Sequence, residues 1–380
     1  IPILNASSGL EHVNSGIFAW DVPNDLSTTV RVRVRNVSGP AVEYISPNVF
    51  KIMARFQVTQ PVGGETALAG FDYAVNWNYW GSATNVKIDL ATDAVAAQAC
   101  SPSYTYDKVI TNSILASLQT TGTSWIVDSN WVDPAVCVRL YDATDMDTAT
   151  YSNAPFSIRA VFAFTGMTEG MNIQLGVPYT IRWNRQGSIA NVQIHYSPDT
   201  LIGGNLSGVI TPIEPTADGI VPNNETACGG SDPNKGCYVW TPPDVDDDKD
   251  EANHLRIRDP NDPGGFVISP AFNLIPRFTV TSPNGNANDA NTDRLEVGKP
   301  WTITWNSTSS VAQTPEVTLS YTTTGGAPYD KTITTTANDG SYSWVTANGG
   351  VPNDISPQVK IRVLDASDGV AFDVSDYNAK

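Results

Sequence analysis

One acidic run carries the residue types best suited to binding a metal ion. Its alternating carboxylates are those of Asp244, Asp246, Asp248 and Asp250. Carboxylate oxygens at this spacing can surround Ca²⁺, a hard cation that accepts irregular loops. The run lacks the glycine and the distal glutamate of an EF-hand loop, and a solvated loop between two strands is the alternative. We therefore treat a calcium site at these four aspartates as a hypothesis.

Residues for catalysis are sparse. The only histidines are His12, His195 and His254, and each falls in a different part of the chain. His195 alternates with apolar neighbours, which predicts a solvent-facing position on a strand. No serine elbow, phosphate-binding glycine loop or histidine-rich metal motif occurs. Paired carboxylates are the one catalytic arrangement left open. We predict no enzyme, no catalytic residue and no certain cofactor.

Four cysteines fall into two pairs. Cys100 and Cys137 share one repeat of the chain, and Cys228 and Cys237 share the next. Pairing within each repeat would give two disulfides, which form and persist in oxidising compartments. Four buried free thiols are the alternative. The disulfide reading places the protein outside the cytoplasm.

A strand motif recurs three times and organises the chain. A glycine precedes a tryptophan by seven residues, and aromatic, aliphatic and Trp side chains follow at every second position, as on a strand that buries one face. The three copies are Gly70–Trp77, Gly176–Trp183 and Gly298–Trp305. A second tryptophan series precedes strands with a central arginine, namely Trp20, Trp125, Trp240 and Trp344. Aspartates after the arginine strands, such as Asp142, are expected to form turns and to accept from the arginine.

These landmarks predict an all-β chain of tandem β-sandwiches, each of roughly 100 residues. The predicted domains are 1–53, which holds only the later strands of a repeat, then 54–159, 160–275 with an insertion, and 276–380 with a truncated last strand. At each junction two phenylalanines lie six residues apart. Such short junctions leave little slack, so we expect a stiff rod, and small-angle scattering from freely jointed domains would contradict this expectation.

Charge and hydropathy exclude several partners. The formal net charge is −17, with only 22 Lys and Arg residues, so a nucleic acid or an anionic membrane would be repelled. No apolar run reaches the roughly 18 residues of a membrane span. The sequence begins inside a repeat, and we expect a piece of a longer polypeptide.

Two features of the sequence concern glycans, one as attached groups and the other as ligands. Five sequons, at Asn5, Asn36, Asn205, Asn224 and Asn306, permit glycosylation. Sugars could also be ligands, because exposed aromatic side chains stack on sugar rings. Only Trp80, Trp131 and Trp301 lie outside the repeating core series. An adhesin stalk or carbohydrate-binding module would use the insertions at 91–106 and 201–236.

The repeats resemble a known family at three motifs: the Gly-x-x-Tyr/Trp-x-Ile-x-Trp strand, Asn338–Trp344 and Val351–Val363. These motifs are similar to the Ig-like repeat of the Kre9/Knh1 type, the Ser-Thr-rich wall protein module. The resemblance implies an Ig-like (fibronectin III-like) sandwich in an exported, cell-surface protein. It implies a non-catalytic structural segment of a surface layer (S-layer), filament or matrix, which associates with copies of itself or with neighbouring surface proteins. An accessory region of an extracellular hydrolase is a further alternative.

Overall fold

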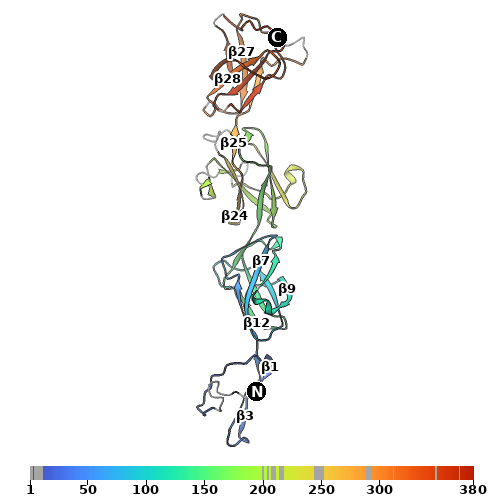
Figure 1. Cartoon of the computed structure of the whole chain (residues 1–380), viewed down its shortest axis with the longest axis vertical. Coiled ribbons are helices and arrows are strands. Elements are labelled where there is room, and N and C mark those ends of the chain that lie inside the picture. Colours follow the sequence, from blue (N-terminus) through green and yellow to red (C-terminus); the bar gives the residue numbers. More distant parts are fainter. Residues whose placement is uncertain are drawn as a thin grey trace. The chain divides into compact units, whose positions relative to one another are not determined.

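The fold is all-β, as predicted. The computed structural model describes residues 3, 12–120, 122–198, 201–202, 205–206, 211–213, 218–243, 252–287, 293–310, 312–346, 349–367 and 369–380. In these residues the regular elements are β-strands and three short 3₁₀ helices (Figure 1). The chain divides into two compact units, which are described separately: 1–160 with the turn Gln186–Ser188, and 161–185 with 189–380.

The first unit holds one complete sandwich. Its smaller sheet has the order β10-β7-β5, with β10 (Thr123–Ile126), β7 (Asp72–Trp80) and β5 (Arg55–Gln60). Its larger sheet has the order β6-β13-β11-β8-β9, with β6 (Thr66–Leu68), β13 (Phe156–Arg159), β11 (Asp133–Asp142), β8 (Asn85–Ala91) and β9 (Lys108–Leu115). Strand β12 (Asp145–Tyr151) pairs with β11, and the helices η1 (Ala116–Thr120) and η2 (Ser129–Trp131) lie in connections.

The same unit also contains two strand pairs from the start of the chain. Strand β1 (Ser27–Val30) pairs with β4 (Phe50–Ile52), and β2 (Arg33–Arg35) pairs with β3 (Glu43–Ile45). Arg33 is the strand arginine of this segment, so the pairs correspond to the later strands of a repeat.

The second unit holds two further sandwiches, each with a three-stranded sheet that matches the smaller sheet of the first. In its first sandwich, one sheet is β14-β16-β22, with β14 (Val161–Thr165), β16 (Tyr179–Gln186) and β22 (Lys235–Trp240). The facing strands are β17 (Asn191–Ser197), β20 (Thr211–Pro212), β21 (Ile220–Pro222), β23 (His254–Asp259) and β24 (Asp262–Ile268), and β15 (Met171–Gln174) pairs with β25 (Phe272–Ile275). The short elements are β18 (Leu201–Ile202), β19 (Asn205–Leu206) and η3 (Thr226–Cys228).

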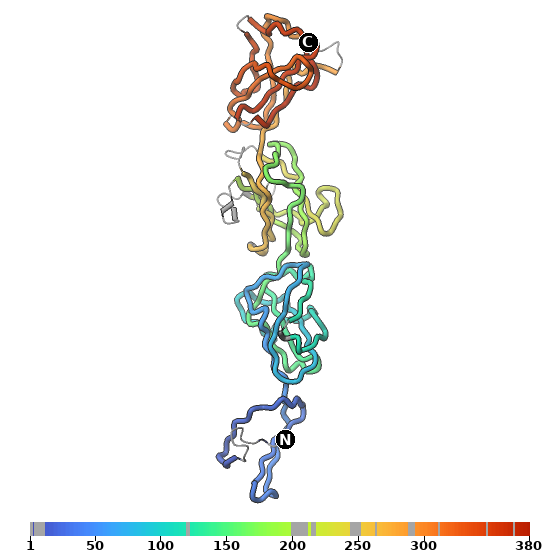
Figure 2. Tube along the Cα trace, in the orientation of Figure 1, coloured from blue at the N-terminus to red at the C-terminus, as the bar shows by residue number. Residues whose placement is uncertain are grey.

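The second sandwich of this unit is the simplest copy. One sheet is β26-β27-β30, with β26 (Phe278–Ser282), β27 (Trp301–Ser307) and β30 (Ser341–Trp344). The other is β29-β28-β31-β32, with β29 (Lys331–Ala337), β28 (Glu316–Thr322), β31 (Lys360–Asp365) and β32 (Phe372–Val374). The course of the chain through each sandwich can be followed in Figure 2. Each sheet takes its strands from one predicted range, and the exact domain boundaries stay a prediction.

The tryptophan of the first series lies at the centre of each sandwich. Trp77, Trp183 and Trp305 are buried, as the period-two pattern predicts. The glycine seven residues earlier has a positive φ in all three copies, 79° at Gly70, for example, and 79° again at Gly298. Glycine adopts this left-handed conformation without a steric cost, which explains why it recurs at this turn.

Candidate functional site

Both predicted disulfides are present. Cys100 and Cys137 are bonded with a Cα–Cα distance of 5.7 Å, and Cys228 and Cys237 are bonded at 6.3 Å. Cys137 lies on the buried strand β11, so its bond fixes the insertion that contains Cys100 to the core of the sandwich. The cysteines are therefore structural in both repeats.

The hypothetical calcium ligands Asp244, Asp246, Asp248 and Asp250 lie outside the described residues. Within the part of the chain that the structure describes, no three or more His, Cys, Asp or Glu side chains are grouped to hold a metal ion. The calcium site therefore remains a prediction from the sequence.

The sequons have different surroundings. Asn36 and Asn306 are exposed, and Asn224 is partly buried. The side-chain oxygens of Asn36 and Asn224 accept from the backbone N–H two residues later. Asn5 lies outside the described residues, and for Asn205 only the strand position on β19 is described. Glycosylation at all five remains a prediction.

The expectation that His195 faces solvent is wrong. The residue is only 6% exposed, and it lies on the central strand β17, with Pro212 of β20 and Arg256 of β23 opposite it. Burial first, and then the positive charges of Arg256 and Arg258, together lower the pKa of the imidazole to about 4. His195 is thus a neutral core residue at pH 7.

Each central tryptophan has a hydrogen-bond acceptor in the residue that directly follows one strand of the facing sheet, β9, β21 or β29. The indole Nε1 of Trp183 donates to Oδ1 of Asn223 at 2.9 Å. In the first complete sandwich Trp77 donates to the backbone carbonyl of Ala116, the residue after β9, at 3.1 Å. Sequence reasoning missed Asn223 as a functional partner. In the last repeat the acceptor is Asn338, which directly follows β29 as Asn223 directly follows β21, but the two lie at different distances from the next tryptophan in the sequence, so their spacing gave no signal.

The strand arginines pair across the sheet. The guanidinium of Arg139 donates to the buried carboxylate of Asp89 at 2.6 Å, and Arg362 Nε donates to Ser320 Oγ at 3.1 Å. Asp142 instead accepts from Thr144 and closes the β11–β12 hairpin. The turn role predicted for this aspartate is therefore confirmed, whereas the role as acceptor for Arg139 is wrong. Register between β8 and β11 places Asp89 opposite the arginine.

Of the three tryptophans outside the core series, only one is exposed. Trp80 is 48% exposed, and the guanidinium of Arg55 lies 4.7 Å from its ring centroid. Trp131 and Trp301 are partly buried against the cores of their sandwiches. A row of exposed aromatic side chains is thus not formed by these three residues.

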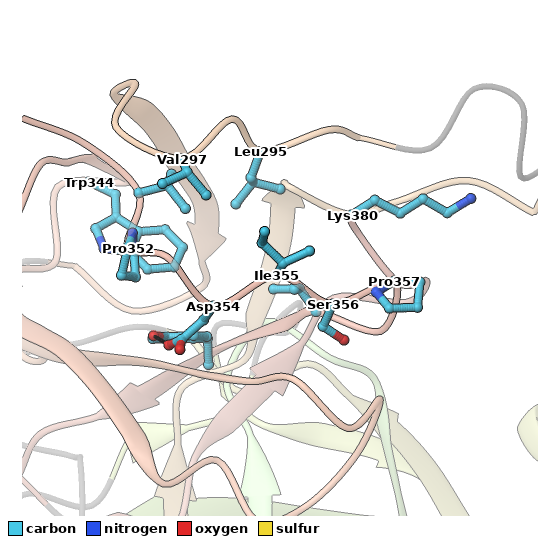
Figure 3. A pocket seen from close by; sticks show the side chains of 12 residues that line it. Leu295, Val297, Trp344, Pro352, Asp354, Ile355, Ser356, Pro357 and Lys380 are labelled. Atoms are coloured by element: carbon cyan, nitrogen blue, oxygen red, sulfur yellow. Dashed lines mark hydrogen bonds between the residues drawn. The ribbon is translucent and has the colours of Figure 1, made fainter.

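A pocket of about 300 Å³ opens at one end of the last sandwich. Figure 3 shows Ile355 beneath Leu295 and Val297, with Trp344 to one side and Asp354 below. The Asp354 carboxylate accepts from the hydroxyl of Tyr321 and, at 2.9 Å, from Nζ of Lys331. Tyr321 and Lys331 lower the pKa of Asp354, so this carboxylate is ionised at neutral pH. The pocket is otherwise lined mainly by apolar side chains.

Comparisons with known proteins return tandem Ig-like structures and no family. No family model matches the chain, and no curated protein matches it. A variant of titin domains I67–I69 has 10% identity and a TM-score of 0.23, covering 85% of this chain and 97% of its own. The complex of Dpr2 Ig1-Ig2 with DIP-Theta Ig1-Ig3 has 12% identity and a TM-score of 0.21, with coverages of 84% and 98%. The fibronectin(III)-like modules of Clostridium thermocellum CbhA have 12% identity and a TM-score of 0.19, with coverages of 58% and 93%.

The strand order given above assigns the fold. That order and the two disulfides define a chain of tandem Ig-like (fibronectin III-like) β-sandwiches. In the described residues, no helix has the length and apolar character that a membrane crossing requires.

Proposed function

We propose that this chain is a non-catalytic structural segment of a large extracellular cell-surface protein, of the surface-layer, filament or matrix kind. One observation supports the proposal: polar side chains inside the sandwiches are hydrogen-bonded to one another and so stabilise the fold. The indole of Trp183 is bonded to Asn223, and the guanidinium of Arg139 is bonded to Asp89. Side chains used in this way stabilise a scaffold and leave no free catalytic group among them.

The disulfides support an oxidising, extracellular location. The resemblance to Kre9/Knh1-type repeats and the net charge of −17 fit the same setting, because an acidic surface attracts divalent cations. On this proposal, copies of the chain or neighbouring surface proteins are the partners, and calcium held by the run 244–250 contributes to their contacts.

Sedimentation velocity tests the proposal. The chain is expected to form larger assemblies as calcium is added at millimolar concentration and to return to monomers when the calcium is chelated. The matched control replaces Asp244, Asp246, Asp248 and Asp250 by Asn, which keeps the shape and removes four charges. Monomers at every calcium and protein concentration would contradict self-association. Equal assembly of the control would contradict the role of the acidic run.

Binding to a carbohydrate is the second candidate, and the exposed Trp80 favours it. Its ring offers a stacking face beside the Arg55 guanidinium. A glycan array probed with the chain and with Trp80→Ala separates the two functions. Binding that Trp80→Ala abolishes would support an adhesive or carbohydrate-binding role, whereas an array without signal favours the scaffold. An accessory role beside a hydrolase would be recognised from a catalytic domain encoded in the same gene.

A further inference from the structure

The loop Val351–Ser356, which borders the pocket of the last sandwich, is a copy of a loop near the start of the chain. Val22–Ser27 reads VPNDLS and Val351–Ser356 reads VPNDIS, so five of six residues are identical. Leu26 and Ile355 each lie seven residues before a strand arginine, and Val132 holds the same position in the first complete sandwich. We call these three aliphatic residues the loop aliphatics.

The first loop aliphatic contacts a glycine turn. Leu26 packs against the core cluster of the sandwich β5–β13. The turn between β7 and β8 contains Gly81, and a Cβ built on it would lie 3.4 Å from Cδ2 of Leu26 and 3.2 Å from Cα of Ala54. Gly81 has a φ of 109°, which other residues rarely adopt. The backbone of this turn therefore lies directly against Leu26.

The second loop aliphatic contacts an equivalent turn in the same compact unit. A Cβ on Gly187 would lie 2.9 Å from Cγ2 of Val132 and 2.8 Å from Cβ of Ala160, and the φ of Gly187 is 110°. The N–H of Ser188 donates to the carbonyl of Ser129 at 2.7 Å, which adds a main-chain bond to the apolar contact. Two independent copies of the repeat thus show the same pairing.

The two glycine turns also share a sequence position. Gly81 follows the buried Trp77 by four residues, and Gly187 follows the buried Trp183 by four residues. A Trp-x-x-x-Gly turn is therefore the recognisable partner of a loop aliphatic.

The third loop aliphatic differs from the other two in its exposure. Ile355 is 88% exposed, and it stands in the pocket of about 300 Å³ (Figure 3). An exposed isoleucine beside an apolar cavity is unfavourable in water, because burying such a side chain is worth roughly 1.5–3 kcal/mol. Apolar surface of this kind marks an interaction site.

We propose that Ile355 and the pocket around it form a docking socket for the Trp-x-x-x-Gly turn of another Ig-like repeat joined to this one in the same polypeptide. The turn would contact Ile355 as the Gly81 turn contacts Leu26. This inference rests on the proposed structural function, since it names the surface by which one repeat holds another. It does not involve calcium or lateral assembly, so its test is separate from the sedimentation experiment.

The test adds one repeat to the full chain. Ala379 lies seventeen residues after Arg362, as Phe50 lies seventeen residues after Arg33, so a second copy of residues 52–159 attached directly to Lys380 keeps the natural register.

Ile355→Cys is introduced in both the 380-residue chain and the extended chain. All four native cysteines are in disulfides, and the added copy of 52–159 brings its own Cys100–Cys137 pair, so in both chains a maleimide reports on position 355 alone. Phe372→Cys, on β32 of the same sandwich and outside the pocket lining, is the matched control.

Labelling at position 355 is expected to be roughly ten- to a hundredfold slower in the extended chain, as burial of one aliphatic side chain implies. Labelling at position 372 is expected to stay unchanged. Equal rates at position 355 in the two chains would overturn the proposal. In the 380-residue chain, labelling at position 355 that becomes slower as the protein concentration rises would also overturn the proposal, because a second copy would then be the occupant.

Amide hydrogen exchange provides a second measurement without any substitution. The amides of Val351–Ser356 are expected to exchange more slowly in the extended chain, whereas those of β32 should not change. Unchanged exchange across Val351–Ser356 would overturn the proposal even if the cysteine variant failed to fold.

Discussion

The indole Nε1 of Trp305 donates a 2.8 Å hydrogen bond to Oδ1 of Asn338, and both side chains are buried. Replacing Asn338 by Ala would leave the indole N–H without this acceptor, and a buried unsatisfied donor costs about 1–3 kcal/mol. We expect Asn338→Ala to lower the free energy of unfolding by that amount in urea titrations. Asn306→Ala, on an exposed position of β27, is the control and should change little. If Asn338→Ala lowered the free energy of unfolding no more than the control does, water would have replaced the amide as the acceptor of the indole N–H.

The Arg139–Asp89 pair is expected to be the most sensitive charged contact. Asp89 is almost fully buried, and its removal would leave the guanidinium of Arg139 unpaired in the sheet. We expect Asp89→Ala to cost about 3–5 kcal/mol in chemical denaturation. The exposed pair of Lys108 and Asp107 offers a contrast, and Asp107→Ala should leave the unfolding midpoint nearly unchanged. Similar effects of the two substitutions would contradict the buried-pair interpretation.

His195 makes stability depend on pH. Its folded-state pKa of about 4 lies below the ordinary value of 6.5, so the unfolded chain takes up a proton first as pH falls. This contribution is fully present above pH 6.5 and is lost progressively as pH falls toward 4. We expect urea midpoints between pH 7.5 and 4.5 to fall more steeply for the wild type than for His195→Gln. His12→Gln, at an exposed position, should keep the wild-type slope.

The two disulfides should differ in their effect on stability. Cys100 and Cys137 are 37 residues apart, whereas Cys228 and Cys237 are 9 residues apart. Restriction of the unfolded chain predicts stabilisation of about 4 kcal/mol for the longer loop and about 2.5 kcal/mol for the shorter one. Calorimetry of the two Cys→Ser double variants would check this order. A larger loss from the Cys228/Cys237 variant would contradict the loop-length argument.

The last sandwich is expected to fold alone. Its core cluster runs from Ile275 to Ala379, and its sheets comprise β26 to β32. A fragment of residues 275–380 should therefore unfold cooperatively, at a midpoint close to that of the same region in the full chain. Broad, non-cooperative melting of the fragment would show that the predicted boundary near residue 276 is misplaced.

The tryptophan strands could be predicted because a strand with one buried face imposes a period of two on its own sequence. Trp183 and its alternating neighbours therefore indicated both the element and its buried face. The cysteine pairing was accessible for a similar reason, since both members of each pair fall within one repeat.

Contacts that depend on register between distant strands could not be predicted. Asp89 faces Arg139 only because β8 pairs with β11 at that register, and nothing local to either residue fixes it. His195 illustrates the same limit. Its alternation with apolar residues suggested an exposed face, but His195 lies on a central strand between β20 and β23 and is buried.

The Cys100–Cys137 bond has a mechanical consequence. A pull on the two ends of the chain is transmitted through the bond, so the stretch between these two cysteines, which are 37 positions apart, bears no tension. Fully extended, that stretch would span on the order of 120–130 Å. While the disulfide is intact, this length does not contribute to the extension of the first complete sandwich under force. Reduction of the bond would add it to the extended length in a single step.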